Sequence, residues 1–296
     1  MTPRRHTYLI AAGLLLTAAA AAAESKFERT VSAEPDGIVT VDNISGSVTV
    51  TGWSRNEVEV IGWLGKGVEE VDIDTSGRVV DIEVELGGRS RGWDSNARLE
   101  IRVPEGSDVD IEVVSAEVEV EGVTGDVIVE SVSGSIEVES RSRVLELESV
   151  SGSIEAEGEF GRLDAESVSG RVRVRGTAEE VDLSSVSGEL ELRVDGIERA
   201  ELSTTSGGIE LDGAIDPRAE IEAESHSGSI ELQLSPSASA RFRVSTHSGR
   251  ISNELGPPAK RTSRYGPGRE LDFELGGGEG RISIDTFSGS VFLRKR

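Results

Sequence analysis

One ten-residue stretch recurs along most of this sequence. SVSGSIEVES occupies residues 131–140, and SVSGSIEAEG follows at 149–158. The Ser that precedes the Gly returns after 18, 18, 18, 19, 21, 21 and 40 residues, which defines eight marker serines: Ser133, Ser151, Ser169, Ser187, Ser206, Ser227, Ser248 and Ser288. A catalytic serine is needed only once. A period of about 20 residues therefore predicts a repeat architecture of the solenoid type.

The residues between the markers alternate between apolar and polar. Apolar residues stand six and four positions before each marker and three positions after it, as Leu145, Leu147 and Ile154 do around Ser151. Strict alternation is typical of half-buried strands, whereas a helix would need apolar spacings of three and four. The sequence thus predicts an all-β, single-chain β-solenoid with two strands in each coil of about 18–21 residues.

A hydroxyl residue two positions before each marker shares the inward parity of the apolar columns. Stacked hydroxyls can bond to one another or to the turning backbone, and the Gly after each marker supplies a bend or a backbone angle that other residues resist. We therefore interpret the repeated serines as structural. The predicted inward column comprises Ser131, Ser149, Ser167, Ser185, Thr204, Ser225, Thr246 and Thr286.

The N-terminus has the pattern of a secretory signal peptide over residues 1–23. Arg4 and Arg5 precede an apolar stretch from Tyr8 to Ala20, and three Ala residues stand before Glu24. The alternative, a membrane anchor, would need a longer apolar run. Cleavage would remove two positive charges and take the net charge from −24 to −26. We expect an extracytoplasmic protein, in the periplasm or at the cell surface.

The mature chain divides into two parts by regularity. Residues 24–103 keep strand-like alternation but mostly lose the repeat, and we interpret them as an N-terminal β cap and first coil. Residues 104–296 carry the solenoid repeats, with a loop insertion at about 255–270 that is rich in Gly, Pro and basic residues. The cap is expected because an open solenoid end exposes core and strand edges.

Composition excludes several chemistries. The absence of Cys removes disulfides, thiolate metal ligands and cysteine nucleophiles. The excess of 55 acidic over 31 basic side chains argues against binding to a nucleic-acid backbone or an anionic membrane. No stable membrane span is expected after signal cleavage.

Few motifs suggest a site, and we predict no catalytic, cofactor-binding or metal-binding residues. Residues 88–92, GRSRG, match the G-x-S-x-G nucleophile elbow but lack the helix that this motif needs. His226 and His247 each stand one residue before a marker and are expected to stack in successive coils. A metal site with Glu224 is the alternative to an outward ladder position. Asn43 begins a formal glycosylation sequon, but it lies in a strand column.

Four glutamates form an outward column three residues before successive markers: Glu112, Glu130, Glu148 and Glu166. Nothing basic interrupts this column, although Arg173 and Arg175 interrupt two others. It is either a solvated face or a ladder bridged by calcium, for which oxygen ligands are suited. We expect this glutamate column to be a solvated face that does not bind calcium.

The repeated SVSG followed by an alternating strand resembles the bacterial putative-adhesin family of β-strand repeat proteins, a domain class of unknown function. VPEGSDVDIEVVSAEVEVEG at 103–122 and the closing GRISIDTFSGSVFLRK also resemble it. The resemblance implies an extracytoplasmic β-solenoid without established catalytic residues. We therefore expect a non-enzymatic exported protein that binds or scaffolds an envelope protein or glycan. The alternatives are a polysaccharide-active β-helix enzyme and an envelope-sensing partner of a membrane regulator.

The inward assignment of the hydroxyl column can be tested by substitution. Ser149→Asp or Ser167→Asp is expected to destabilise the protein strongly, because a buried unpaired charge is costly. Ser153→Asp, at an outward position, is expected to leave the melting temperature nearly unchanged. Equal melting temperatures for the two classes would contradict the assignment.

Overall fold

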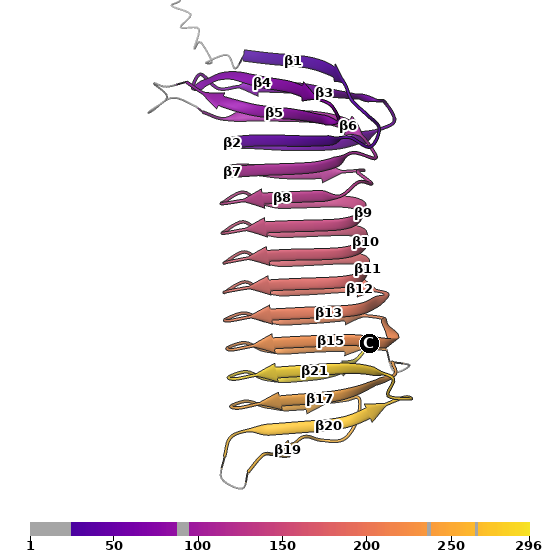
Figure 1. The fold of residues 1–296 in the computed structure, drawn as a ribbon. Coiled ribbons are helices and arrows are strands. Elements are labelled where there is room, and N and C mark those ends of the chain that lie inside the picture. Colours follow the sequence, from indigo (N-terminus) through magenta and orange to yellow (C-terminus); the bar gives the residue numbers. More distant parts are fainter. Residues whose placement is uncertain (1–24, 88–94, 236–237, 264–265) are drawn as a thin grey trace, which may run out of the picture.

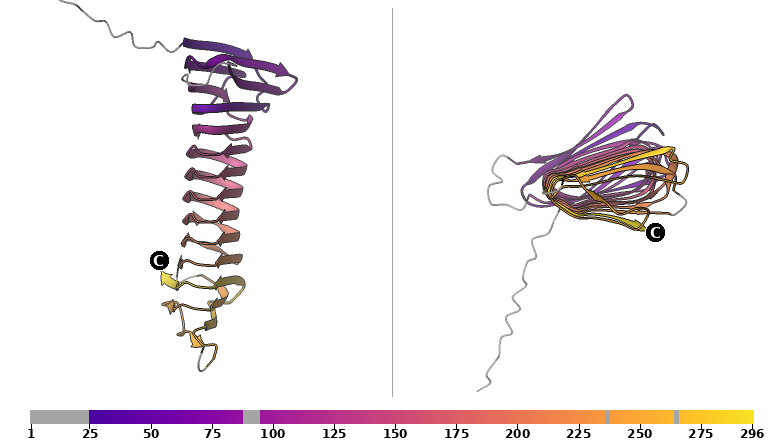
Figure 2. Two further views of the ribbon diagram at one scale, coloured as in Figure 1. Left: turned by 90° about the vertical axis from the view of Figure 1, so that its left-hand side faces the viewer. Right: turned by 90° about the horizontal axis from the view of Figure 1, so that it is seen from below.

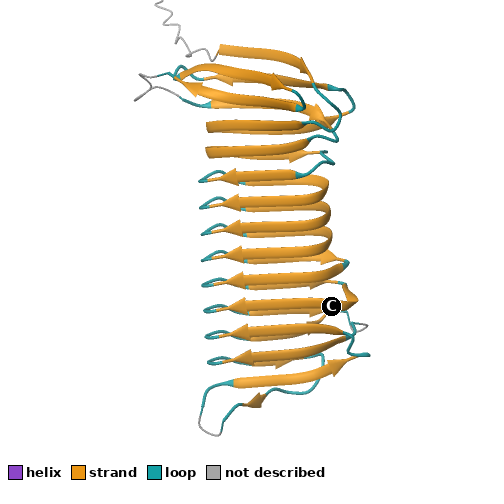
Figure 3. Ribbon diagram, viewed as in Figure 1, coloured by secondary structure: helices purple, strands orange, loops and turns teal. Residues whose placement is uncertain are grey.

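The structure is a computed structural model that describes residues 25–87, 95–235, 238–263 and 266–296. The predicted signal peptide, residues 1–23, and the GRSRG motif lie outside these ranges. The 22 described strands form a rod of stacked coils (Figure 1, Figure 3). The described residues contain no helix, and hence no helical segment that could span a bilayer. The predicted all-β solenoid is confirmed.

Parallel strands in continuous register build the body of the rod. Leu145 pairs with Leu163, and Leu163 pairs with Val181, so each apolar column passes from coil to coil. Turned by 90°, the body is a narrow spiral with one strand layer on each side (Figure 2). The strands of the body are β7 (Asp108–Glu121), β8 (Val127–Ser131), β9 (Ile136–Ser149), β10 (Ile154–Ser167), β11 (Val172–Ser185), β12 (Leu190–Asp195), β13 (Ile197–Thr204), β14 (Ile209–Gly213), β15 (Ile215–Ser225) and β16 (Ile230–Leu234).

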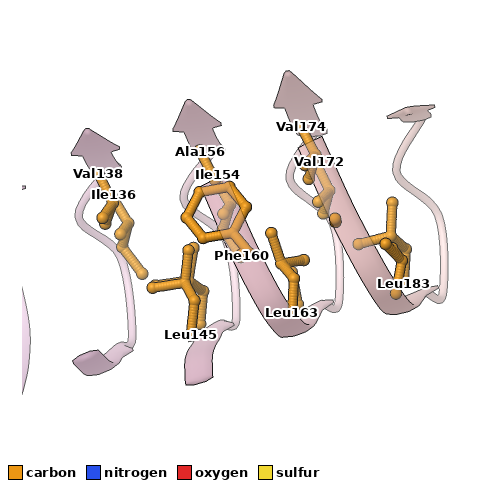
Figure 4. Packing of buried hydrophobic residues seen from close by; sticks show 14 of the residues in the cluster. Ile136, Val138, Leu145, Ile154, Ala156, Phe160, Leu163, Val172, Val174 and Leu183 are labelled. Carbon is orange, nitrogen blue, oxygen red and sulfur yellow. The ribbon is translucent and has the colours of Figure 1, made fainter. Parts of the chain in front are cut away.

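The core is the space between the two strand layers. Leu145, Leu163 and Ile154 are almost completely buried there and stack with their counterparts in adjacent coils (Figure 4). In the coil that contains β10, Phe160 turns inward and is 4% exposed, while two column positions hold the small residues Ala156 and Ala165. The volume lost at the two alanines is thus available to the aromatic ring, which keeps the interior close-packed.

Each coil turns at the marker sequence, and the glycines there stack almost in contact. A Cβ atom on Gly152 would overlap the carbonyl oxygen of Gly134, and one on Gly170 would overlap that of Gly152. None of the eight marker glycines has a positive φ. Of the two roles considered from the sequence, an unusual backbone angle is therefore wrong. Glycine is needed because successive turns approach too closely for any side chain.

At the N-terminal end, the parallel stack gives way to antiparallel strands. The first coil, β2 (Ile38–Trp53), pairs with β7 on one side and with β5 (Val79–Leu86) and β6 (Ala97–Pro104) on the other. The strand β4 (Val68–Ser76) then pairs antiparallel with β5, β3 (Glu57–Leu64) with β6, and β1 (Ser25–Ser32) with β3. This arrangement pairs backbone groups that an open end of the solenoid would leave exposed.

The C-terminal end departs from the order of the sequence. The last segment, β21 (Gly280–Thr286) and β22 (Val291–Lys295), lies between the coil of β15 and β16 and the coil of β17 (Ala240–Thr246) and β18 (Ile251–Asn253). Part of the expected insertion, β19 (Lys260–Arg261), pairs with β20 (Arg269–Leu275), which covers β17 in the antiparallel direction. The expectation that coils marked by Ser227 and Ser248 are neighbours is therefore wrong. By entering the stack, the last segment gains a hydrogen-bonded neighbouring strand along each of its two edges.

The two adjacent glycines Gly207 and Gly208 allow a direct test of the stacking constraint. Gly207→Ala is expected to destabilise the rod strongly, because its Cβ would overlap the carbonyl oxygen of Gly188. Gly208→Ala is expected to be tolerated, since its Cβ would lie 3.7 Å from the nearest atom, the carbonyl oxygen of Ser229. Thermal unfolding of both variants provides the measurement. Similar melting temperatures would contradict the role assigned to the marker glycines.

Candidate functional site

An exposed line of apolar side chains runs along the edge of the rod where the marker turns lie. We call it the apolar ridge, and its members are between 41% and 49% exposed: Ile44, Val114, Val132, Val150, Val168 and Val186. The backbone holds them outward, because the N–H of each turn residue donates to the coil before it; for example, Val150 donates to the carbonyl of Ser131 at 3.1 Å. The result is one exposed apolar side chain per coil, in register.

The buried hydroxyl column helps to hold the marker turns of the body in shape. All eight predicted residues are at most 8% exposed, so the inward assignment is confirmed. Ser149 accepts a hydrogen bond from the N–H of Gly152 at 2.8 Å, and Ser185 accepts one from Gly188 at 2.7 Å. The hydroxyls of Ser131, Ser149, Ser167 and Ser185 therefore bond to the turning backbone, one of the two alternatives, whereas those of Thr204 and Thr286 have no hydrogen-bond partner among the described residues. This repeated bond places Val132, Val150, Val168 and Val186 at equivalent positions in their coils.

Beside the ridge, the predicted glutamate column is part of a longer carboxylate series. We call it the acidic ladder, and its members pair one after another across seven strand positions: Asp72, Glu83, Asp42, Glu112, Glu130, Glu148 and Glu166. Sequence reasoning missed the first three because the chain order of the N-terminal strands differs from their order in space.

The acidic ladder carries uncompensated charge. Burial raises the pKa of the Glu148 carboxyl, and the neighbouring Glu130 and Glu166 raise it further. The pKa of Asp42 is raised by burial first and then by Glu112. Within the described ranges, no ladder carboxylate forms an ion pair with a basic side chain.

The opposite strand layer is neutralised in its middle part. The Arg173 guanidinium lies 2.8 Å from Glu191 and 3.5 Å from Glu155, and Arg175 lies 2.8 Å from Glu155. The hydrogen bond from Arg173 lowers the pKa of Glu191. The carboxylates around Arg173 on this layer are therefore paired with arginine, whereas those of the acidic ladder are not.

A hollow of about 360 Å³ lies where the ridge and the ladder meet near the N-terminal end. Ile44, Val114 and Val132 of the ridge line it together with Asp42 and Glu112 of the ladder. A second hollow, of about 660 Å³, occupies the equivalent columns near the C-terminal end. The surface along this edge is thus concave at both ends of the rod.

The two histidines line the C-terminal hollow but do not stack on each other. Phe287 lies between them, with ring-centroid distances of 4.9 Å to His226 and 4.8 Å to His247. The expected His226–His247 stack is wrong, because β21 enters between their coils. The imidazoles lie on opposite faces of Phe287, which prevents them from sharing a metal ion. Among the described residues, no three His, Asp or Glu side chains are placed to hold one.

The sequon is closed to modification in the folded chain. Asn43 is 2% exposed, and its Nδ2 donates to the carbonyl of Ala97 at 3.1 Å. The amide nitrogen that would carry a glycan is therefore buried and already engaged.

The repeat pattern and fold agree with a known family. The model of the Toastrack DUF4097 family matches residues 39–291. The chain belongs to this family. The resemblance to the putative-adhesin family is thereby confirmed, and Toastrack DUF4097 is a domain of unknown function. No curated protein matches the chain.

Solved structures share the Toastrack fold at low sequence identity. A putative adhesin from Bacteroides fragilis is 12% identical, with a TM-score of 0.51, over 92% of this chain and 98% of that one. A putative adhesin from Parabacteroides distasonis is 13% identical, with a TM-score of 0.50 and the same shares covered. A putative lipid binding protein from the same species is 14% identical, with a TM-score of 0.53, over 90% and 96%. These likenesses show the fold alone.

The different ion pairing of Glu148 and Glu155 predicts opposite effects of replacing each with Gln. At pH 7, Glu148→Gln is expected to raise the melting temperature by roughly 2–4 °C, since removing about 1 kcal/mol of repulsion shifts a chain of this size by that amount. Glu155→Gln is expected to lower it, because Arg173 and Arg175 lose their partner.

The pH dependence of the Glu148→Gln effect follows from the raised pKa. The folded state binds this proton more tightly than the unfolded state, so the stability of the wild type rises as the pH falls through the window between the two pKa values. Below that window, the carboxyl is neutral in both states and the advantage of Gln disappears. An advantage that persists at about pH 3 would contradict this explanation.

Proposed function

We propose that this protein is a non-enzymatic, exported, adhesin-like rod that binds or scaffolds a component of the bacterial cell envelope through its ridge edge. The observation that carries the proposal is the apolar ridge itself. A contiguous line of exposed apolar side chains on a soluble surface is typical of an interaction site. The description of two structural relatives as putative adhesins supports a binding role.

The chemistry of the surface favours binding over catalysis. The inward hydroxyls of Ser149 and Ser167 are engaged by the turn backbone, and the histidines stack on Phe287. A polysaccharide-active enzyme acting on acidic glycans would need basic and carboxylate groups converging on one subsite, whereas the ridge edge is lined by unpaired carboxylates. Export rests on the signal-peptide pattern of residues 1–23.

The proposal is tested with isolated cell envelopes of the producing bacterium. The variant Val132→Thr/Val150→Thr/Val168→Thr keeps the side-chain shape, and Thr205 shows that the column tolerates threonine. It is expected to sediment with envelopes about tenfold less than the wild type, because three exposed apolar groups become polar.

The control is Glu121→Gln/Glu139→Gln/Glu157→Gln, which changes a stacked column on the opposite strand layer. It is expected to bind as the wild type does. Equal binding of wild type and ridge variant would overturn the proposal, as would release of reducing ends from envelope polysaccharide by the wild type. Lipid-extracted and protease-treated envelopes identify which component is bound.

A further inference from the structure

The ridge edge pairs two chemistries that point to one class of partner. The apolar ridge supplies one apolar group per coil, and the acidic ladder runs parallel to it, two residues earlier in each turn. On the other flank of the ridge, the hydroxyls of Ser151 and Ser169 are uncharged and donate to the carbonyls of Val132 and Val150. A complementary partner therefore has an apolar stripe with positive charge along one side.

The distribution of arginine distinguishes the ladder from the carboxylates around Arg173 on the opposite layer. On the opposite layer, Arg173 and Arg175 lie among the carboxylates and pair with them. The ladder beside the ridge has no such partner within the described ranges. Like charges on neighbouring strands repel each other. Cations supplied by a bound molecule would therefore relieve the mutual repulsion of Glu130, Glu148 and Glu166.

The spacing of the ridge selects the conformation of the partner. Adjacent coils are about 4.8 Å apart, so the six ridge residues span roughly 24 Å. An α-helix laid along the rod presents a new apolar group every turn of about 5.4 Å, close to the coil spacing, and covers this length with about 16 residues. A strand laid along the rod presents side chains on one side only about every 6.8 Å, a repeat that does not match the coil spacing of about 4.8 Å.

The hollow at the N-terminal end provides room at this contact. The hollow has a volume of about 360 Å³ and is lined by Ile44 and Val114 of the ridge and by Asp42 and Glu112 of the ladder. It can receive a long basic side chain whose methylene groups pack on the ridge while its charge reaches the carboxylates, as Lys and Arg side chains do at amphipathic surfaces.

We propose that the apolar ridge and the acidic ladder together bind a cationic amphipathic helix that lies along the rod axis. The proposal rests on the proposed binding function and names the class of its partner. A second copy of this chain is the wrong occupant, because it would bring another strongly acidic surface against the ladder. An anionic membrane surface is disfavoured for the same reason.

The test uses synthetic 18-residue helices as probes, labelled for fluorescence anisotropy. The first has a Leu stripe flanked by Lys, the second has Glu in place of each Lys, and the third has the composition of the first in an order that forms no stripe. The mature protein is expected to bind the first probe at least tenfold more tightly than either of the others. Zwitterionic vesicles serve as the competing lipid arm.

Matched variants locate the binding on the rod. Glu130→Gln/Glu148→Gln/Glu166→Gln removes three charges from the ladder, and Glu121→Gln/Glu139→Gln/Glu157→Gln removes three from a stack on the opposite layer. The ladder variant and the ridge variant, Val132→Thr/Val150→Thr/Val168→Thr, are each expected to weaken binding of the first probe about tenfold, which corresponds to 1.4 kcal/mol. The opposite-layer variant is expected to bind within twofold of the wild type.

Several outcomes would overturn the inference. Equal losses in the two charge variants would mean non-specific attraction to an acidic protein, and equal binding of the scrambled probe would mean that no helical stripe is recognised. Binding to vesicles in place of the first probe would assign the ridge to lipid. If the probes fail while the ridge variant still loses envelope binding, the partner class is wrong and the proposed function stands. If the ridge variant binds envelopes normally, the proposed function itself fails.

Discussion

The close approach of successive marker turns is the constraint on which the rest of the structure depends. Each marker glycine of the body lies against the carbonyl of its counterpart in the adjacent coil. The glycine N–H also donates a hydrogen bond to the hydroxyl two residues before the marker, in coils such as those of Ser149, Ser167 and Ser185. The turns therefore cannot slide, and the strands that leave them start in register. Because the strands are in register, equivalent apolar residues of successive coils stack and form the columns of the core.

The same constraint creates the candidate binding edge. The residue between the buried hydroxyl and the marker has the opposite parity to that hydroxyl, so its side chain lies at the surface once per coil. Where that residue is Val or Ile, the result is the apolar ridge. The neighbouring outward position carries the acidic ladder, whose repulsion persists because its carboxylates form no ion pair with a basic side chain within the described ranges. Because each coil repeats the same outward positions, their side chains form a line along the rod. Extended surfaces of this kind are what repeat proteins commonly use to bind their partners.

Both ends of the rod are closed by strands that leave the sequential order. The first coil is covered by β5 and β6, which come later in the chain, and the final segment enters between two earlier coils. In each case, antiparallel strands lie beyond the last parallel pairing. Covering the edges in this way protects a long sheet from pairing with other chains.

The sequence by itself determined the fold class, the inward columns and the outward parity of the ridge and ladder, because alternation and an 18-residue period act locally. It could also identify the glutamates of the body, from Glu112 to Glu166. It could not add Asp72, Glu83 and Asp42 to the ladder, nor place Phe287 between His226 and His247. Those juxtapositions depend on which strand edges remain open after the coils form, and only the tertiary structure decides how the chain returns to fill them.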